Sequence, residues 1–287
     1  MDFNYKNIPY NTKLEELLDF YQTSVALSHA LGITRMTLMA WQDKPEKIKI
    51  KNQDKIDLLW CQYVLLPKID NQVQTVEGIA LGDFLHETAR LEKSIKKMSS
   101  GSLEIETGTK ETDFNLIINN DIVPNNFRAK EVLEVQNIYY LTKQVSENYQ
   151  QKIDLKTIKL WHKDLMTGLL ENAGEFSTKQ RVLDNVDTML THPNDIEKEL
   201  ENWTAENQDA QSLSAIAKAH YNFEIIHPFS DGNGRIGRII MLAQCLQNNI
   251  KPPIINNDNK ALYYILLDKA KTNPTPLAYF LKACSKS

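Results

Sequence analysis

One loop of this chain gathers side chains that could carry out group transfer. Residues 227–238 read HPFSDGNGRIGR. His227 titrates near neutral pH, so it could take a proton from an attacking hydroxyl. Asp231 supplies the hard oxygen ligand that Mg²⁺ prefers, and Mg²⁺ normally accompanies phosphates. A base and a metal ligand in one loop therefore indicate chemistry on a phosphate-bearing substrate.

The second half of the loop is suited to hold an anion. Gly232 and Gly234 flank Asn233, and such a chain can turn tightly and point its N–H groups into one concavity. A helix is predicted to begin near Gly234, so its unpaired N–H groups and its dipole favour negative charge there. Arg235 and Arg238 lie on one face of that helix, and their planar guanidinium groups bind phosphate oxygens in pairs. This arrangement predicts a polyphosphate ligand.

The elements that position this loop are predicted to be helices. Gly and Pro are scarce, at 10 each in 287 residues, and apolar residues recur with helical spacing. We expect a mainly α fold with a short β-hairpin in residues 174–190. Three regions are predicted: a helix-turn-helix-like module (1–66), a helical connector (67–112) and a domain that contains the loop (113–287).

Composition and charge narrow the function classes. The net charge is -4 and the pI about 5.9, so the whole chain is not attracted to nucleic acid or to anionic membranes. Three widely spaced cysteines (Cys61, Cys245, Cys284) give no disulfide framework or zinc spacing, which favours a reducing compartment. The first residues lack the order of a signal peptide, and no apolar run reaches membrane-spanning length. We expect a cytoplasmic protein with no membrane partner; export without a hydrophobic signal stays open.

Within the N-terminal module, two short helices and a turn suggest a binding function. Thr23 or Ser24 can cap a helix through Leu31, and Thr34 can cap a second helix after the turn at Gly32. The stretch is similar to a helix-turn-helix motif, whose second helix reads DNA. From the second helix onward, six basic residues accompany three acidic ones, which suits phosphate contact. DNA is one candidate partner, and a module that binds a protein or only packs is the alternative.

In the connector we expect a helix from Ile79 to Met98. Its apolar stripe is uneven, and Ser99-Ser100-Gly101 is predicted to end it.

The loop also carries a family resemblance. Residues 227–238 fit the Fic signature, His-x-Phe-x-(Asp/Glu)-Gly-Asn-(Gly/Lys)-Arg-x-x-Arg, at every fixed position. Looser similarity covers about residues 102–284, including the lead-in helix around His220 and the segment Gly174-Glu175-Phe176. The chain thus resembles Fic-type protein adenylyltransferases, which transfer AMP from ATP to a protein hydroxyl. The resemblance implies a helical bundle with a β-hairpin flap.

Each signature residue receives a role from this resemblance. His227 deprotonates a Tyr, Thr or Ser hydroxyl of a target protein, which attacks the α-phosphorus of ATP while pyrophosphate leaves. Phe229 pins the loop into the core, and Asp231 holds Mg²⁺ between the α- and β-phosphates. The other assignments are the anion hole at the α-phosphate (Gly232, Asn233, Gly234), the β-phosphate contact (Arg235) and the γ-phosphate contact (Arg238).

The resemblance also assigns a flap to residues 174–190. In the family the flap aligns the target chain as an added strand, and Val182 and Leu183 are the docking residues expected here. One departure concerns the residue after Gly-Glu-Phe, where the family often has Arg and this chain has Ser177. Arg181 is too far along to be its simple substitute, so flap docking or target choice is expected to differ.

A candidate inhibitory helix precedes the domain. Many Fic proteins carry the pattern (Ser/Thr)-x-x-x-Glu-(Gly/Asn), whose Glu pairs with the second signature arginine and blocks the γ-phosphate. Ser102 to Glu106 fits the first five positions, with Thr107 at the sixth. The rival pair Glu77-Gly78 has Val73 where Ser or Thr is expected. We therefore predict that Glu106 pairs with Arg238 as a bidentate carboxylate partner and inhibits the enzyme.

Two other functions stay open. The same site could remove AMP from a modified protein, with Glu106 positioning a water molecule. The chain could instead be a DNA-binding regulator whose Fic domain senses nucleotide or dimerises. Relatives with the inhibitory helix often form homodimers, but this sequence does not indicate an interface.

Overall fold

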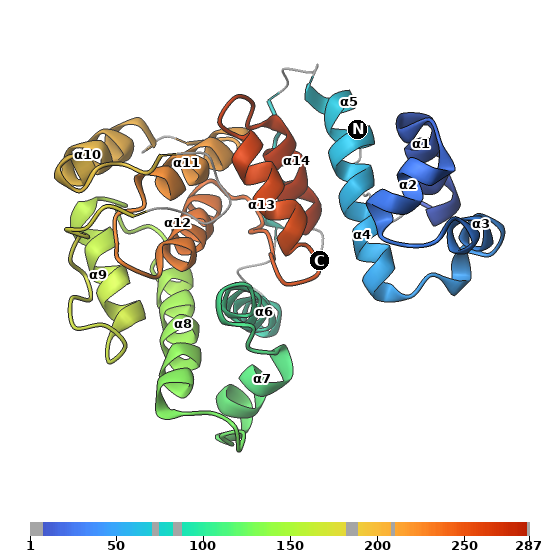
Figure 1. Ribbon diagram of the computed structural model, residues 1–287. Helices are drawn as coiled ribbons and strands as arrows, with labels where there is room; N and C mark the ends of the chain where they lie inside the picture. Colours follow the sequence, from blue (N-terminus) through green and yellow to red (C-terminus); the bar gives the residue numbers. More distant parts are fainter. Residues whose placement is uncertain (1–7, 71–74, 83–87, 182–188, 208–209, 286–287) are drawn as a thin grey trace.

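The computed structural model describes residues 8–70, 75–82, 88–181, 189–207 and 210–285. Within these ranges the chain folds into helices, with one isolated antiparallel bridge between Ala80 and Ile250 and no strand. The predicted mainly α class is therefore confirmed. Figure 1 shows the N-terminal helices beside α13 (Lys260–Lys269) and α14 (Thr275–Cys284), with the remaining helices on the other side. None of the helices in the described ranges is long and apolar enough to span a bilayer.

The N-terminal module is a small helical unit with a core of its own side chains. Leu14, Leu27, Leu38 and Trp60 are buried in it, in a cluster that continues into α13 and α14. The module is thus packed against the rest of the chain. Its elements are α1 (Tyr10–Tyr21), α2 (Ser24–Leu31), α3 (Arg35–Asp43), the 3-10 turn η2 (Pro45–Lys47), α4 (Ile50–Trp60), the π-helical turn η3 (Cys61–Leu65) and α5 (Leu66–Asp70).

The caps of α2 and α3 follow the sequence. The Thr23 hydroxyl accepts a hydrogen bond from the Ala26 N–H, and Thr34 caps α3 in the same way. Gly32 lies between the helices with a φ of 67°, a left-handed conformation that glycine adopts without steric cost. Arg35 lies on the exposed part of α3. DNA binding by this module stays a prediction.

The second part of the fold surrounds the loop of residues 227–238, which we call the signature loop. Two helices hold it, α11 (Leu213–Ile226) before it and α12 (Asn233–Gln247), which contains its second half. Nearly every residue of α12 is buried, so the loop is anchored in the core. The surrounding helices are α6 (Thr88–Thr107), α7 (Glu111–Asn120), α8 (Ala129–Glu147), α9 (Leu155–Met166), the 3-10 turn η5 (Pro193–Asp195) and α10 (Ile196–Asn207).

The structure corrects the predicted connector helix. Helix α6 runs from Thr88 to Thr107, so it continues through the Ser99-Ser100-Gly101 stretch that was expected to end it. Gly101 has a packing role instead, because a Cβ atom there would lie 2.4 Å from the backbone oxygen of Ile255. Ser99 and Ser100 are buried beside it. Ser102 and Glu106 therefore belong to the last turns of one long helix, packed against the segment that precedes α13.

Gly101→Ala is expected to lower the stability of the protein. Overpacking costs about 1 to 3 kcal/mol, more than the roughly 1 kcal/mol that Ala gains over Gly within a helix. Urea unfolding of this variant should show a lower midpoint than the parent protein. Lys93→Ala, at an exposed position of α6, is the matched control and should leave the midpoint nearly unchanged. An unchanged midpoint in Gly101→Ala would show that the Ile255 backbone can move aside.

Candidate active site

His227 lies at the point where α11 ends. Its φ is 49°, in the left-handed region, and Pro228 follows it and prevents continuation of the helix. The ring Nδ1 is 3.2 Å from the carbonyl oxygen of Glu224, one turn earlier. When Nδ1–H donates to this carbonyl, Nε2 is left with the lone pair that can accept a proton.

The surroundings keep His227 neutral. Burial and the charge of Arg181 together lower the pKa of His227 to about 4. A neutral imidazole can act as a base, whereas an imidazolium cannot. The residue is therefore in the protonation state that general base catalysis requires at physiological pH.

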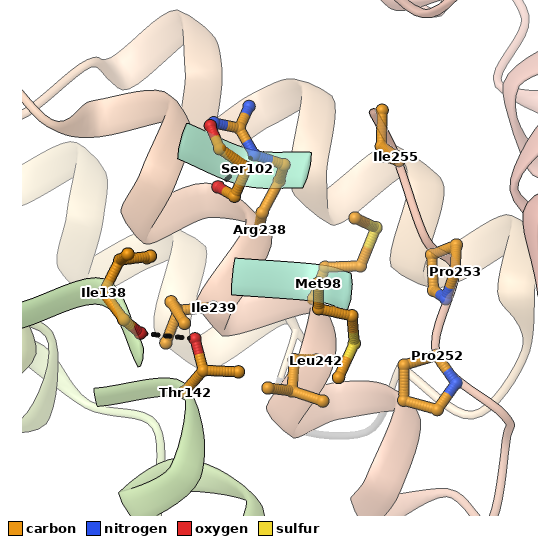
Figure 2. Close-up of a pocket in the computed structure, with 11 residues that line it drawn as sticks. Met98, Ser102, Ile138, Thr142, Arg238, Ile239, Leu242, Pro252, Pro253 and Ile255 are labelled. Atoms are coloured by element: carbon orange, nitrogen blue, oxygen red, sulfur yellow. Dashed lines mark hydrogen bonds between the residues drawn. The ribbon is translucent and has the colours of Figure 1, made fainter. Parts of the chain in front are cut away.

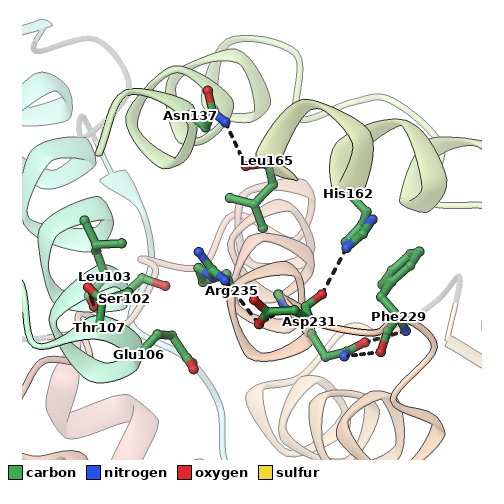
Figure 3. Close-up of polar contacts among 12 residues, drawn as sticks. Ser102, Leu103, Glu106, Thr107, Asn137, His162, Leu165, Phe229, Asp231 and Arg235 are labelled. Carbon is green, nitrogen blue, oxygen red and sulfur yellow. Dashed lines mark hydrogen bonds and ion pairs between the residues drawn. The ribbon is translucent and has the colours of Figure 1, made fainter. Parts of the chain in front are cut away.

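Contacts from three segments fix the first half of the signature loop. The Phe229 N–H donates to Asn233 Oδ1, and Asn233 Nδ2 donates to the Phe229 carbonyl, both at 2.8 Å. The His162 ring stacks on the Phe229 ring with centroids 3.7 Å apart. His162 Nε2 also lies 3.0 Å from the Asp231 carbonyl oxygen (Figure 3). The Gly174 N–H donates to His162 Nδ1. His162 thus connects the signature loop to the segment that follows α9.

Sequence reasoning did not identify His162 as part of the site. It was noted only within the helix similar to that of the family, because nothing in its local spacing shows that it stacks on Phe229. Burial lowers the pKa of His162 to about 4, so its ring is neutral and can donate from Nε2 to a carbonyl. We regard it as a positioning residue for the loop.

Asp231 is the one signature carboxylate. Its side chain is 59% exposed, and its Oδ1 accepts from the Gly232 N–H and lies 3.4 Å from Arg235 Nη2. No group of three or more His, Cys, Asp or Glu side chains that could hold a metal occurs in the described ranges. A single accessible carboxylate fits Mg²⁺, which is usually held by one or two carboxylates together with substrate phosphates.

The beginning of α12 has the features of a candidate anion site. Gly232 precedes it with a φ of 79°, and a side chain there would meet the sulfur of Met166. Arg235, in the first turn, is 3% exposed, and its Nε and Nη1 are buried without a partner among the described residues. Buried guanidinium donors are normally hydrogen-bonded, so unpaired ones indicate a missing anion.

A carboxylate from α6 already occupies part of this site. Glu106 Oε1 accepts from Arg238 Nη2 at 2.6 Å, and a Cβ atom on Gly234 would lie 2.6 Å from the same oxygen. Burial opposes ionisation of Glu106, but the charge of Arg238 and the hydrogen bond outweigh it and lower its pKa. Glu106 is therefore an anion held beside the first turn of α12, as its place in Figure 3 illustrates.

Ser102 holds the other side of Arg238. The Arg238 Nε donates to the Ser102 hydroxyl at 2.8 Å, and Nη2 also lies 3.3 Å from the Ser102 carbonyl. Figure 2 shows both residues at the edge of a small cavity between α6, α8, α12 and the segment before α13. The two residues predicted for the inhibitory pattern, Ser102 and Glu106, thus both contact Arg238.

Beneath Arg238 lies a buried polar cluster that the sequence did not reveal. His220 Nε2 is 2.5 Å from the Tyr263 hydroxyl, and a Cβ atom on Gly237 would lie 2.4 Å from Glu224 Oε1. Burial raises the pKa of Glu224 to about 7, although the charge of Arg238 opposes this. Because Glu224 Oε1 lies so close to position 237, the packing of α11 against α12 leaves little room for a side chain there.

Both ends of the predicted flap are attached beside His227. The Ser177 N–H donates to the Pro228 carbonyl at 2.8 Å, and the Thr191 N–H donates to the Ile225 carbonyl at 3.2 Å. The expected docking residues Val182 and Leu183 lie outside the described residues, and no strand occurs in the described parts of 174–190. The hairpin stays a prediction, but its two ends flank the base.

Arg181 contacts the signature loop, contrary to expectation. It was judged too far along the chain to replace the arginine that the family often has at the position of Ser177. Its Nη1 nevertheless donates to the Phe229 carbonyl at 2.7 Å. The reason is that the backbone is already attached to the loop at Ser177, so four further residues suffice to return a long side chain to it.

The comparison with protein families decides the assignment. Residues 152–245 match the model of the Fic/DOC family. This segment is therefore similar to a Fic domain. It includes α9, α10, α11 and nearly all of α12, and therefore His162, the flap segment and the whole signature loop.

Curated relatives match shorter stretches of this chain. "Protein adenylyltransferase Fic" of Nematostella vectensis is 33% identical over 101 residues, which are 33% of this chain and 23% of that protein. The protein of the same name from Aedes aegypti is 37% identical over 71 residues, which are 24% of this chain and 14% of that protein. The matches thus span less than a quarter of these relatives.

Solved structures extend the likeness of fold beyond the Fic domain. A fragment of Fic-1 from C. elegans has a TM-score of 0.62 at 16% identity and covers 96% of this chain and 94% of that chain. A Fic family protein from Desulfovibrio desulfuricans has a TM-score of 0.57 at 21% identity, over 72% of this chain and 66% of that chain. At such identities the likeness concerns the fold.

Proposed function

We propose that this protein transfers AMP from ATP to a hydroxyl side chain of a target protein. The observation that carries the proposal is the anion site at the start of α12. Arg235 has buried donors without a partner among the described residues, Arg238 holds a carboxylate, and His227 lies at the other end of the same loop. This combination suits transfer of a phosphoryl-containing group to a deprotonated hydroxyl.

In the proposed reaction, separate residues of this chain accept the proton and bind the phosphates. The target hydroxyl gives its proton to His227 Nε2, its oxygen forms a bond to the α-phosphorus, and the bond to the β-phosphate oxygen breaks. The N–H groups around Gly232, Asn233 and Gly234 receive the α-phosphate, while Arg235 and Arg238 hold the β- and γ-phosphates. Asp231 would hold Mg²⁺, which neutralises phosphate charge when bound.

In this proposal Glu106 inhibits the enzyme through its contact with Arg238, and we call this contact the brake. The Glu106 carboxylate lies beside Gly234 and contacts Arg238, which is the residue proposed to hold the γ-phosphate of ATP. A third phosphate and this carboxylate would repel each other at that distance. We infer that the protein by itself transfers AMP slowly, and that displacement of Glu106 permits productive binding of ATP.

The acceptor approaches His227 from the flap side. Residues 174–190 would align the target chain as an added strand. The contacts of Ser177 with Pro228 and of Thr191 with Ile225, both close to His227 in the chain, support this assignment. Val182 and Leu183 are the proposed docking residues. The target is a protein with an exposed Tyr, Thr or Ser.

Labelled ATP tests the reaction. Incubation of Glu106→Gly protein with ATP labelled at the α-phosphate should leave label on protein, whereas γ-labelled ATP should leave none because pyrophosphate departs. Label from the γ position would indicate phosphorylation and contradict the proposal. Absence of α label, together with loss of AMP from a premodified target, would indicate the reverse reaction.

The pH dependence of transfer should reflect the lowered pKa of His227. We expect the rate of Glu106→Gly protein to stay nearly constant from about pH 8 to about pH 5.5, since the neutral base persists to lower pH when its pKa is lowered. The rate should then fall only as the pH reaches about 4 or below, because the pKa is about 4 in the parent and the variant lacks the Glu106 charge that raises it. Initial rates measured with circular dichroism at each pH separate this effect from unfolding. A fall centred near pH 6.5 would contradict the described environment of His227.

A further inference from the structure

Arg181 has hydrogen-bonding capacity that the folded chain does not use. Nη1 donates to the Phe229 carbonyl, but Nε and Nη2 are buried and have no partner among the described residues. Burial lowers the pKa of Arg181 from its ordinary value. A shielded guanidinium with two unpaired donors is costly unless an anion binds there in the working state.

The position of this guanidinium identifies the anion. The Phe229 carbonyl accepts from both Arg181 Nη1, at 2.7 Å, and Asn233 Nδ2, at 2.8 Å. Sharing one acceptor places the guanidinium within two hydrogen-bond lengths of the Asn233 side chain, in the first turn of α12. Its charge also acts on His227. Arg181 is thus close both to the base and to the anion site at the helix start.

The group that lies between the base and the anion site during reaction is the α-phosphoryl group. Arg235 and Arg238 belong to α12, and in the proposed function they hold the outer phosphates. Arg181 comes from the separate segment after α9, which is attached to the loop at Ser177 and Pro228. Its place beside Phe229 and Asn233 suits the transferred phosphate rather than the departing ones.

We propose that Arg181 is a further catalytic residue, whose Nε and Nη2 donate to non-bridging oxygens of the α-phosphoryl group during transfer. This inference rests on the proposed function. During transfer the acceptor oxygen forms a bond to the α-phosphorus, and pyrophosphate leaves with the electron pair of the broken bond. The negative charge on the non-bridging oxygens of the α-phosphoryl group changes in this step. Preorganised donors shielded from water stabilise such charge most effectively. Arg181 also donates a hydrogen bond to the Phe229 carbonyl of the signature loop, a contact that the short side chain of Ser177 cannot make.

The test compares Arg181→Gln with the parent, both in the Glu106→Gly background, at pH 8 where His227 is neutral in both. Transfer from α-labelled ATP should be about 100-fold slower or more, as is typical when a donor to the reacting group is lost. The dissociation constant for ATP should change less, by about threefold or under, because the contact forms in the transition state. Lys198→Gln, an exposed cation on α10 outside the flap segment and the signature loop, is the control and should keep the parent rate.

Sulfur substitution at the α-phosphate separates a direct contact from a structural one. The parent should transfer AMP from ATP faster than it transfers the thio analogue from one diastereomer of ATPαS, because sulfur accepts hydrogen bonds poorly. The ratio of the rate with ATP to the rate with this diastereomer should be about tenfold smaller in Arg181→Gln. An unchanged ratio with a slow rate would show that Arg181 only holds Phe229, and would overturn the inference. A normal rate in Arg181→Gln would also overturn it. Absence of label in the Glu106→Gly parent would instead refute the proposed function.

Discussion

Replacement of Glu106 by Gly is expected to raise both ATP affinity and AMP transfer by at least about tenfold, the effect of about 1.4 kcal/mol. The carboxylate accepts a hydrogen bond from Arg238 Nη2 at 2.6 Å, so it would compete with the γ-phosphate that Arg238 is proposed to hold. Its removal leaves the Arg238 guanidinium available for phosphate, while Ser102 still holds Nε. Calorimetric titration with ATP and label transfer from α-labelled ATP measure the two effects separately.

A second glutamate on the same helix provides the control. Glu104→Gly weakens the last turns of α6 to a similar degree, but Glu104 accepts from the Asn257 N–H and is not a partner of Arg238. This variant should therefore keep the low basal transfer of the parent. If Glu104→Gly activates as strongly as Glu106→Gly, then loosening of α6, and not the carboxylate, controls activity.

Replacement of His227 by Asn in the Glu106→Gly background is expected to slow transfer by about 100- to 10,000-fold, the usual contribution of a general base. Asn is chosen because it tolerates the left-handed backbone of this position, where φ is 49°, better than Ala does. The phosphate contacts of α12 are unaffected, so the dissociation constant for ATP should stay nearly the same. Single-turnover rates with ATP in excess isolate the chemical step.

The matched control is a histidine away from the site. His29→Asn changes an exposed residue of α2 and should leave the rate unaltered. A loss of ATP binding in His227→Asn equal to its loss of rate would show that the loop has been distorted. A rate close to that of the parent would exclude His227 as the base.

The part of the site that could be predicted from the sequence is the signature loop, because its functional residues lie in one short segment. The signature loop places a base, a carboxylate, glycines and two arginines within twelve residues, so its sequence indicates both the fold family and the roles. The contact of Glu106 with Arg238 spans 132 positions, and a local pattern indicated it only through resemblance to other proteins. The resemblance to the Fic family came from the loop, and residues 152–245, which include the loop, match the model of that family.

The parts that sequence reasoning missed depend on contacts between distant segments. Gly101 was interpreted as a helix end because glycine weakens helices, whereas its lack of a side chain admits the Ile255 backbone. Arg181 was dismissed on sequence distance, although its backbone is attached to the loop four residues earlier. The stacking of His162 on Phe229 also joins separate elements. Periodicity and spacing contain no information about such pairs.

The contact between Glu106 and Arg238 joins two segments of one chain, and this would determine how the proposed brake responds to conditions. A tethered carboxylate meets its arginine at an effective concentration set by the fold, and dilution of the protein does not reduce that concentration. ATP must therefore compete with a group that is always present. Release of the brake depends on how often the Glu106 side chain leaves Arg238, so a partner that changes this rotamer would act as a switch at any protein concentration.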